Sequence, residues 1–343
     1  MRAASGIVRP RRERRTACWS TAAPSRYVAA HTSVFPRGVV VQTRELANVE
    51  LVTDGLGFPE GPVAMPDGSV LVVEIVRGHI SRVEADGTKT LVADTGGGPN
   101  GAAIGPDGAL YVCNNGGMLD GPRGQPGIQR VDLATGVSSY LYSESGGRPL
   151  VAPNDLVFDA SGNFYFTDLR GDAIHYANPD GSSVRPVITG IPRPNGIGLS
   201  PTGDTLYWAQ TQTRQVLRRG IEQPGVLTAS TGITTAAVIA HGLVDRWSLL
   251  VGLPGCWELD SLAVDSSGAV CVGTLIEGGI TEVSPDGGLD NVTRWELPEE
   301  FADGLVTNIA FGGPDLTTAY LTCSASGRLV RCTWHRPGLR LGF

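Results

Sequence analysis

Five short polar turns carry the side-chain oxygens in this chain that could do chemistry. Each turn places an acid or an asparagine next to a glycine, an aspartate or a serine: Pro59-Glu60-Gly61, Pro99-Asn100-Gly101, Pro153-Asn154-Asp155, Pro194-Asn195-Gly196 and Leu259-Asp260-Ser261. Each stands ahead of a Gly-containing turn, and equivalent positions in the repeats of a closed ring converge on one axis. The pattern therefore predicts a point at which oxygen ligands from several repeats meet.

A repeated turn-and-strand unit must position these residues. Units recur near residues 67, 107, 161, 202, 267 and 313, as in PDGSVLVVE from Pro66 and PDGALYVCN from Pro106. Each joins a tight turn to an apolar, β-branched or aromatic run, and the spacing suits four short strands plus loops. We predict an all-β fold, a six-bladed β-propeller, in which residues 46–56 complete the last blade.

The composition agrees with this fold. The chain has 343 residues with 47 Gly and 23 Pro, too many for a helical protein and spaced as turns. We expect the propeller over residues 46–335 and a short tail over 336–343. Residues 1–45 carry nine arginines and lack the apolar core of a secretory signal. They are expected to be a disordered tail, an upstream start-site artefact or an Arg-rich transit peptide.

Charge and residue inventory exclude several functional classes. The net charge of −7 gives no reason to expect a nucleic acid or an anionic membrane as partner, and no apolar run approaches the ~18 residues of a membrane span. Lys89 is the only lysine and lies in a predicted surface turn, which argues against Schiff-base chemistry. The six cysteines show no CxxC spacing, so we expect a reducing compartment, the cytoplasm. The oligomeric state stays open.

Taken together, these motifs resemble a known family. EGPVAMPDG, PNDLVFDASGNFYFTD, PNGIGLSPTGDTLYW, the Asp260 turn before LAVDSSGAVCV, and VTNIAFGGPDLTTAYLT from Val306 are similar in order and type to the senescence-marker-protein/gluconolactonase (regucalcin-like) family. Within that family, the Asn154-Asp155 segment and Asp260-Ser261 look closest to the drug-responsive bacterial lactonases. The resemblance covers residues 50 to about 333 and implies a propeller that hydrolyses lactones with a divalent metal at its centre.

The resemblance implies a ligand set, carried over by motif, of Glu60, Asn154, Asn195 and Asp260. Two carboxylates and two amide carbonyls make a hard, all-oxygen site, which suits Ca²⁺ first and Mg²⁺, Mn²⁺ or Zn²⁺ as alternatives. An isolated Asn-Gly or Asn-Asp can also be a plain turn. The recurrence of such pairs at one phase of the repeat favours the ligand interpretation.

Three further residues are expected near the substrate. Asn100 is assigned to the pocket wall, Asp155 either braces its turn or contacts metal or water, and His241 could cap the mouth of the channel. His79 and His175 are interpreted as structural. Since GxSxG and HExxH motifs are absent from the sequence, nothing supports nucleophilic serine catalysis or a histidine-based metal site.

The reaction implied is the opening of a lactone to its hydroxy acid, with Asp260 as general base. The metal would polarise the lactone carbonyl. Two alternatives remain open: a phosphotriester or phosphofluoridate hydrolase on the same scaffold, and a non-enzymatic calcium-binding propeller. The expected partner is a small-molecule lactone.

Overall fold

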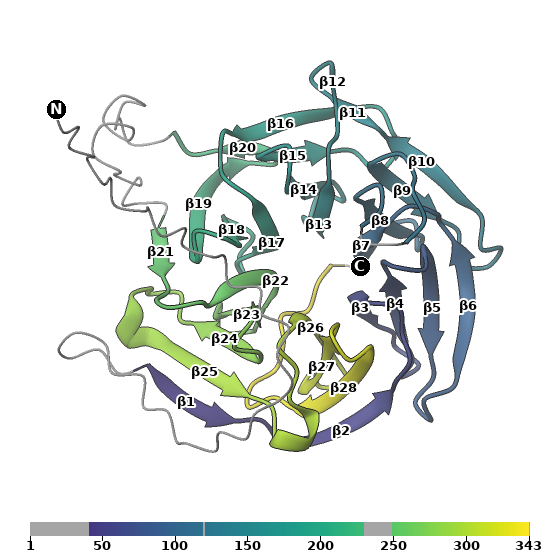
Figure 1. Ribbon diagram of the computed structural model, residues 1–343. Helices are drawn as coiled ribbons and strands as arrows, with labels where there is room; N and C mark the ends of the chain where they lie inside the picture. The colour runs from purple at the N-terminus through teal and green to yellow at the C-terminus, as the bar shows by residue number, and fades with distance from the viewer. Residues whose placement is uncertain (1–40, 119–120, 230–248, 343) are drawn as a thin grey trace, which may run out of the picture. The chain divides into compact units, whose positions relative to one another are not determined.

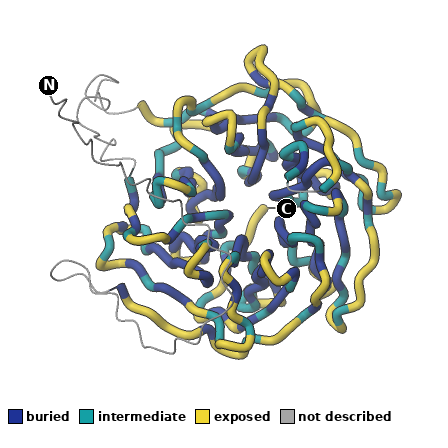
Figure 2. The backbone as a smooth tube through the Cα atoms, in the orientation of Figure 1, coloured by how far each residue is buried: buried dark blue, intermediate teal, exposed yellow. Residues whose placement is uncertain are grey.

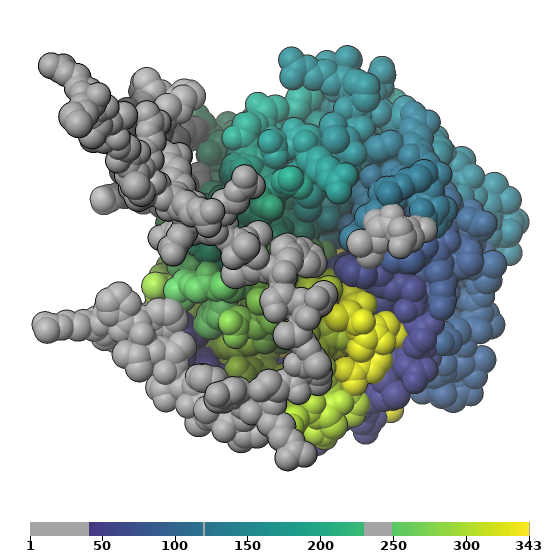
Figure 3. All heavy atoms as spheres, viewed as in Figure 1, coloured from purple at the N-terminus to yellow at the C-terminus, as the bar shows by residue number. Residues whose placement is uncertain are grey.

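The alternating turns and apolar runs form six predominantly antiparallel sheets, the blades of a β-propeller (Figure 1). The computed structural model describes residues 41–118, 121–229 and 249–342. Figure 3 shows one face of the propeller, with the blades following one another round the ring in chain order. The predicted all-β, six-bladed architecture is confirmed.

The first three blades contain four strands each. Blade 1 consists of β3 (Pro59–Ala64), β4 (Val70–Glu74), β5 (His79–Val83) and β6 (Lys89–Asp94). Blade 2 consists of β7 (Pro99–Ile104), β8 (Leu110–Asn114), β9 (Gly127–Val131) and β10 (Ser138–Tyr142). A small hairpin of β11 (Glu144–Ser145) and β12 (Arg148–Pro149) leads to blade 3, which consists of β13 (Pro153–Phe158), β14 (Phe164–Asp168), β15 (Ala173–Ala177) and β16 (Val184–Thr189).

The other three blades carry additions. Blade 4 consists of β17 (Pro194–Leu199), β18 (Thr205–Gln210), β19 (Gln215–Gln223), β20 (Val226–Leu227) and β21 (Leu249–Gly252), the last two both pairing with β19. Blade 5 consists of β22 (Glu258–Val264), β23 (Val270–Leu275), β24 (Ile280–Val283), β25 (Val292–Glu296) and β1 (Gln42–Glu45), with 3₁₀ turns at Leu289–Asn291 and Glu299–Phe301 before and after β25. Blade 6 consists of β26 (Val306–Gly312), β27 (Thr318–Cys323), β28 (Arg328–Thr333) and β2 (Ala47–Thr53).

The ring is closed by a strand from the other end of the sequence. β2 pairs antiparallel with β28, as predicted for residues 46–56, so that both ends of the propeller sequence share blade 6. β1 precedes the expected boundary at residue 46 and pairs parallel with β25, so this strand also belongs to the sheet. Each innermost strand contacts the innermost strand of the next blade, from β3 round to β26 and back to β3.

The hydrophobic core lies between blades. The second strands, such as VLVVE and FYFTD, are buried along their whole length, and the outermost strands are largely exposed (Figure 2). One cluster packs Tyr111 of blade 2 against Phe158, Phe164 and Phe166 of blade 3. Burial on both faces explains why these strands are continuous apolar runs rather than alternating ones.

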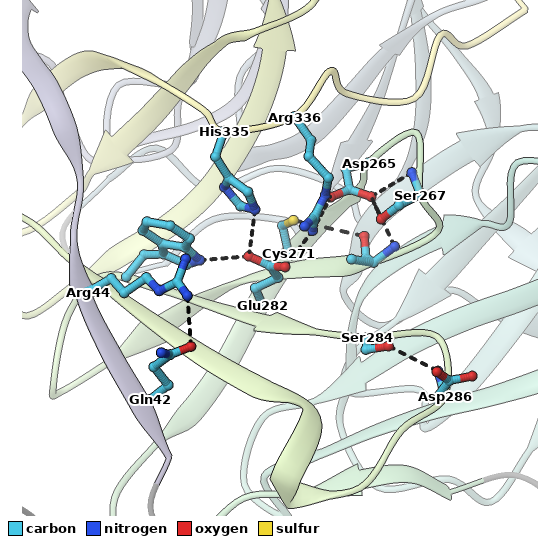
Figure 4. A network of polar contacts seen from close by, with 12 residues as sticks. Gln42, Arg44, Asp265, Ser267, Cys271, Glu282, Ser284, Asp286, His335 and Arg336 are labelled. Atoms are coloured by element: carbon cyan, nitrogen blue, oxygen red, sulfur yellow. Dashed lines mark hydrogen bonds and ion pairs between the residues drawn. The ribbon is translucent and has the colours of Figure 1, made fainter.

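The segment that follows β28 crosses blade 5 toward the middle of the ring. Arg336 bridges Asp265 Oδ2 and Glu282 Oε1, at 2.7 and 2.5 Å (Figure 4). Glu282 Oε2 also accepts a 2.7 Å hydrogen bond from Trp295 Nε1, and His335 stacks on the Trp295 ring. Arg336, the first residue of the expected C-terminal tail, is therefore fastened to blade 5.

Within the described part of the chain, no helix has the length and apolar character needed to cross a membrane. Each cysteine that the structure describes is a free thiol: Cys113, Cys256, Cys271, Cys323 and Cys332.

Candidate metal centre and active site

The innermost strand of every blade leaves its ladder at the same place. The pairing register shifts between Glu60 and Val63 in blade 1, and a similar irregularity occurs in the other five blades. Such bulges re-aim a side chain away from the sheet. Beside these bulges, near the start of each inner strand, every blade carries a polar residue, and we call these six the ring of polar residues: Glu60, Asn100, Asn154, Asn195, Asp260 and Asn308.

In all six blades, the polar residue stands the same number of positions before a residue of positive φ in the following turn. Glu60 stands eight positions before Gly68, whose φ is +88°, and the four next blades repeat this spacing with a glycine of positive φ. In blade 6, Asn308 stands eight positions before Leu316, which adopts a φ of +59°. Sequence reasoning missed Asn308 because a leucine occupies the position at which the other turns have glycine. The Thr-Asn pair at equal spacing was the signal that could have found it.

Glycine next to the polar residue lets neighbouring blades approach closely. A Cβ on Gly196 would lie 2.5 Å from the backbone nitrogen of Leu262 and 2.7 Å from the carbonyl oxygen of Asp260, both in blade 5. A Cβ on Gly101 would lie 2.6 Å from the carbonyl oxygen of Asn154 in blade 3. The predicted Asn-Gly pairs thus have a packing role as well as a possible ligand role.

Four oxygens of the ring are buried without a hydrogen-bond partner. They are Glu60 Oε1, Asn100 Oδ1, Asn154 Oδ1 and Asn195 Oδ1. An unpaired buried acceptor costs about 1–3 kcal/mol, so several at one place call for an occupant that supplies positive charge. The oxygens fit a hard cation, which is the occupant that all-oxygen sites favour.

Glu60 is held so that only one of its oxygens is free. Glu60 Oε2 accepts hydrogen bonds from the Gly61 nitrogen and from Asn308 Nδ2, each at 2.7 Å. Asn308 is itself fixed, because its Oδ1 accepts a 2.8 Å hydrogen bond from the Ile309 nitrogen. The carboxylate is therefore oriented with Oε1 as its available ligand atom.

Asn195 is oriented in a similar way. Its Nδ2 donates a 3.0 Å hydrogen bond to Thr211 Oγ1, which leaves Oδ1 as the unpaired atom. The Thr167 hydroxyl donates to the Asn195 carbonyl at 2.8 Å and accepts from the Asp155 nitrogen at 3.1 Å. This buried threonine ties the polar turns of blades 3 and 4 together. Neither threonine could be predicted from the sequence, since both come from positions outside the repeated polar turns.

Polar residues at the ends of the second strands hold the loops that lead into the site. Asp168 accepts hydrogen bonds from the backbone nitrogens of Val151, Ala152 and Gly171. Glu74 and Asn114 do the same for the loops of blades 1 and 2. The approach of the chain to Glu60, Asn100 and Asn154 is thus fixed by buried side chains.

Negative charge is concentrated at the ring centre. Burial raises the pKa of Glu60, and it raises the pKa of Asp155 and of Asp260 well above the usual range, with the Glu60 charge adding to both shifts. Among the described residues, none of the three carboxylates forms an ion pair with an arginine or lysine. A divalent cation would compensate this charge.

The chemistry of the donor set is that of an amide-rich site. Over the described ranges, no three His, Cys, Asp or Glu side chains form a metal-binding cluster. Here most of the unpaired oxygens belong to asparagines, which such a cluster would not include. The set contains oxygen donors only, and this favours Ca²⁺ or Mg²⁺ over ions that prefer nitrogen or sulfur.

The structure places most of the predicted residues at one end of the inner strands. Asn100 lies in the same ring as the expected ligands, and Asp155 follows Asn154 on β13, where its Oδ1 accepts a 3.0 Å hydrogen bond from the Leu156 nitrogen. His241 lies outside the described residues. His175 lies in β15, the third strand of blade 3, where its Nδ1 meets Ser145 Oγ at 2.8 Å and its imidazole stacks on Phe166. The roles assigned to these residues stay predictions.

A cavity of about 940 Å³ adjoins the ring of polar residues. Its walls are formed by the rest of the six inner strands. The ring adjoins it at Asn308, which lines the cavity, and at Gly61 and Asp155, which follow Glu60 and Asn154 in the chain. Turn residues such as Gly68 and the C-terminal residues Leu339–Leu341 form its far end.

The comparisons with known proteins agree on one family. The sequence model of the SMP-30/Gluconolactonase/LRE-like region matches residues 58–325. The chain is 30% identical over 222 residues to the lactonase drp35 of Staphylococcus haemolyticus, an alignment that covers 61% of this chain and 65% of that protein. It is 29% identical over 213 residues to the lactonase drp35 of Staphylococcus saprophyticus, covering 60% and 62%. The chain therefore spans somewhat less than two thirds of these relatives.

Solved structures share the fold. A gluconolactonase from Xanthomonas campestris superposes with a TM-score of 0.66 at 20% identity, covering 84% of this chain and 89% of that one. A calcium-binding protein, regucalcin, from Agrobacterium tumefaciens superposes with a TM-score of 0.66 at 19% identity, covering 88% and 100%. At these identities the likeness is one of fold.

Proposed function

Because the chain belongs to the SMP-30/gluconolactonase/LRE-like family, we propose that it is a metal-dependent lactonase that opens a lactone ring to the hydroxy acid. The observation that carries this proposal is the set of buried, unpaired oxygens on Glu60, Asn154 and Asn195 around the carboxylate of Asp260. The names of the staphylococcal relatives support the reaction type.

Glu60, Asn154, Asn195 and Asp260 would hold the cation, with Ca²⁺ as first choice and Mg²⁺, Mn²⁺ or Zn²⁺ as alternatives. When bound, the cation would polarise the lactone carbonyl and favour the ionised form of the neighbouring carboxylates. Asn100 contributes another unpaired oxygen in the same ring. We assign it to the substrate side of the site.

Asp260 is the proposed general base. Its side chain interacts with Asn195 and with the Ser261 backbone, and it lies in the field of Glu60 and Asp155. A carboxylate so placed can accept the proton of an attacking water. Asp155 would support it by holding the turn of blade 3 through Leu156.

Among the described residues, the exposed thiol of Cys256 and the four buried thiols form no disulfide with one another. We propose the cytoplasm, a reducing compartment, as the location. A small-molecule lactone remains the proposed substrate.

A panel of lactones, scored by acid release with and without chelator, tests the reaction. In Asp260→Asn one carbonyl oxygen remains for the metal but the base is lost. We expect measurable metal binding with hydrolysis reduced by roughly 10²- to 10⁴-fold. Asp290→Asn, an exposed position in the same blade, is the matched control and should keep full activity.

Two results would contradict the proposal. If saturating Ca²⁺ or Mn²⁺ restored full activity to Asp260→Asn, Asp260 would be a ligand and not the base. If the unmodified protein, loaded with each candidate metal, released no acid from any lactone, the proposed reaction would be wrong.

A further inference from the structure

Beyond the ring of polar residues, the inner strands present mostly apolar side chains and glycines to the cavity. Of the lining residues that these strands contribute to the 940 Å³ cavity, only Asp155 and Asn308 are polar. All others are apolar or glycine, and each blade supplies at least one, for example Val63, Ile104, Leu156, Ile197, Leu262 and Ile309. We call this cavity the apolar chamber.

The apolar chamber has the size of a ligand site. Small-molecule pockets span about 300–1,000 Å³ and are mostly apolar with a few polar groups at one place. From Gly61 to Ala64 the strand β3 runs along the chamber for roughly 10 Å, at about 3.3 Å per residue. The polar end, at Asp155 and Asn308, adjoins the candidate metal centre, and Asn308 contacts Glu60 directly.

The C-terminal segment builds the far end of the apolar chamber. The Leu339 nitrogen donates to the Val264 carbonyl at 3.0 Å, and the Gly338 nitrogen donates to the Leu316 carbonyl at 2.8 Å. Arg336 anchors the same segment to Asp265 and Glu282 (Figure 4). These contacts hold Leu339 and Leu341 against the chamber, although Leu341 is 56% exposed. Asp67 and Arg340 line the same end, so the two leucines extend the apolar wall up to a rim that also carries charged side chains.

We propose that the apolar chamber binds the aliphatic side chain of the substrate, so that the substrate class is a lactone with an unbranched hydrocarbon chain. This rests on the proposed function, because the polar lactone ring would lie at Glu60 and Asp260 while the chain extends between the inner strands. The middle of the chamber, between the polar end at Asp155 and Asn308 and a rim that includes Asp67 and Arg340, is apolar, and it would accommodate the hydrocarbon chain of such an amphiphilic molecule. A sugar lactone, with hydroxyl groups all round, would leave its polar groups unpaired there.

Chain-length dependence tests the chamber. We compare γ-butyrolactone with γ-decalactone, which carries a hexyl chain on the same ring. The specificity constant kcat/KM should rise by up to roughly fourfold for each methylene buried. In Ala310→Leu, a half-buried chamber residue gains volume that projects into the cavity. This variant should lose most of the preference for γ-decalactone while γ-butyrolactone hydrolysis stays close to normal.

Two further variants keep the test falsifiable. Leu341→Asp changes an exposed residue and should fold normally, and its charge at the far end should weaken γ-decalactone selectively. Ala134→Leu makes the same change as Ala310→Leu in an exposed turn of blade 2 and should leave the preference intact. Equal kcat/KM for both lactones in the unmodified protein, or an unchanged preference in both chamber variants, would overturn the proposal.

A direct binding measurement separates this proposal from the proposed reaction. Titration calorimetry with 1-decanol and 1-butanol needs no turnover. We expect binding of 1-decanol that Ala310→Leu weakens at least tenfold and Ala134→Leu leaves unchanged. If the unmodified protein does not bind 1-decanol, the chamber proposal fails even when lactones are hydrolysed. If 1-decanol binds but no lactone is hydrolysed, the reaction is wrong and the apolar site stands.

Discussion

Asn308 illustrates how single residues decide what the ring of polar side chains can do. Its Nδ2 satisfies Glu60 Oε2 from the opposite end of the sequence, 248 positions away. Thr211 plays the same part for Asn195 by accepting a hydrogen bond from Nδ2. In both cases a partner fixes one atom of the ligand and leaves the other oxygen free, which is how pre-oriented metal sites are built.

The polar turns could be predicted from the sequence, and these partners could not. Glu60, Asn154, Asn195 and Asp260 share a repeat phase that can be read along the chain. Thr167 and Thr211 contact the ring only because blades 3 and 4 lie side by side, and single threonines in strands or turns carry no local signal. The sixth repeat was found near residue 313, but its polar residue Asn308 was missed because Leu316 stands where the other turns have glycine, and a leucine with positive φ is rare.

His175 predicts a pH dependence of stability at the residue scale. Burial lowers the pKa of His175 from 6.5 to about 4. Between these values the unfolded chain binds more protons than the folded protein, so stability should fall as the pH falls from about 6.5 to about 4. The loss should be roughly 3 kcal/mol at most, and denaturant unfolding at several pH values measures it.

The variant His175→Gln removes this titration and should flatten the curve in that window. His79→Gln, at a half-buried position at the start of β5, is the matched control and should keep the slope of the unmodified protein. A slope that persists in His175→Gln would show that other groups cause it.

At the scale of elements, the inner strands combine two tasks. Their first residues carry the polar side chains beside a bulge in the strand. A large side chain at the next position would push the inner strands of adjacent blades apart. Glycine at positions 61, 101 and 196 lets adjacent strands touch. The recurrence of Asn-Gly in the sequence therefore reflects packing between blades as much as ligand chemistry.

The outer strands of the blades were harder to predict than the inner strands. The turn-and-strand units near residues 67, 107, 161, 202, 267 and 313 correctly mark the first hairpin of each blade. The outer strands carry weaker patterns because one edge is exposed, as in β1 with QTRE. The parallel pairing of β1 with β25 depends on a neighbour 251 residues away and has no local cue.

Gly196→Ala tests the close approach of blades 4 and 5. The added methyl would meet backbone atoms of Leu262 and Asp260, which cannot rotate away, so we expect a loss of about 1–3 kcal/mol of unfolding free energy. Because Asn195 is adjacent, metal affinity should fall as well. Gly252→Ala is the matched control, since its nearest neighbour is the Gln215 side chain at 4.0 Å. Equal urea midpoints for the two variants would contradict the packing argument.

At the scale of the molecule, three sets of contacts join parts of the chain that lie far apart in the sequence. β2 completes blade 6, β1 extends blade 5, and Arg336 fastens the C-terminal segment to Asp265 and Glu282. The side chain of Asp265 is fully buried, and its carboxylate accepts a hydrogen bond from the cationic side chain of Arg336. A charge taken out of water in this way depends strongly on its partner.

The candidate metal centre should act as a further link. Its proposed ligands Glu60, Asn154, Asn195 and Asp260 come from blades 1, 3, 4 and 5, and only the closed ring brings them together. Binding to the folded state alone stabilises it by ~2.7 kcal/mol when the free ion is at 100 times Kd. We therefore expect Ca²⁺ to raise Tm by several degrees and a chelator to reverse the gain.

Glu60→Gln identifies the site responsible for that gain. The substitution keeps the shape of the side chain and removes its charge, so the calcium-dependent rise in Tm should shrink sharply. Glu84→Gln makes the same change in blade 1, where the side chain of Glu84 is 44% exposed and pairs with Arg82, and should retain the full rise. Differential scanning calorimetry with and without Ca²⁺ measures both. A full rise in Glu60→Gln would place the stabilising ion elsewhere, and the absence of any rise with Ca²⁺, Mg²⁺, Mn²⁺ or Zn²⁺ in the unmodified protein would mean that the ring of oxygens does not link the blades through a metal.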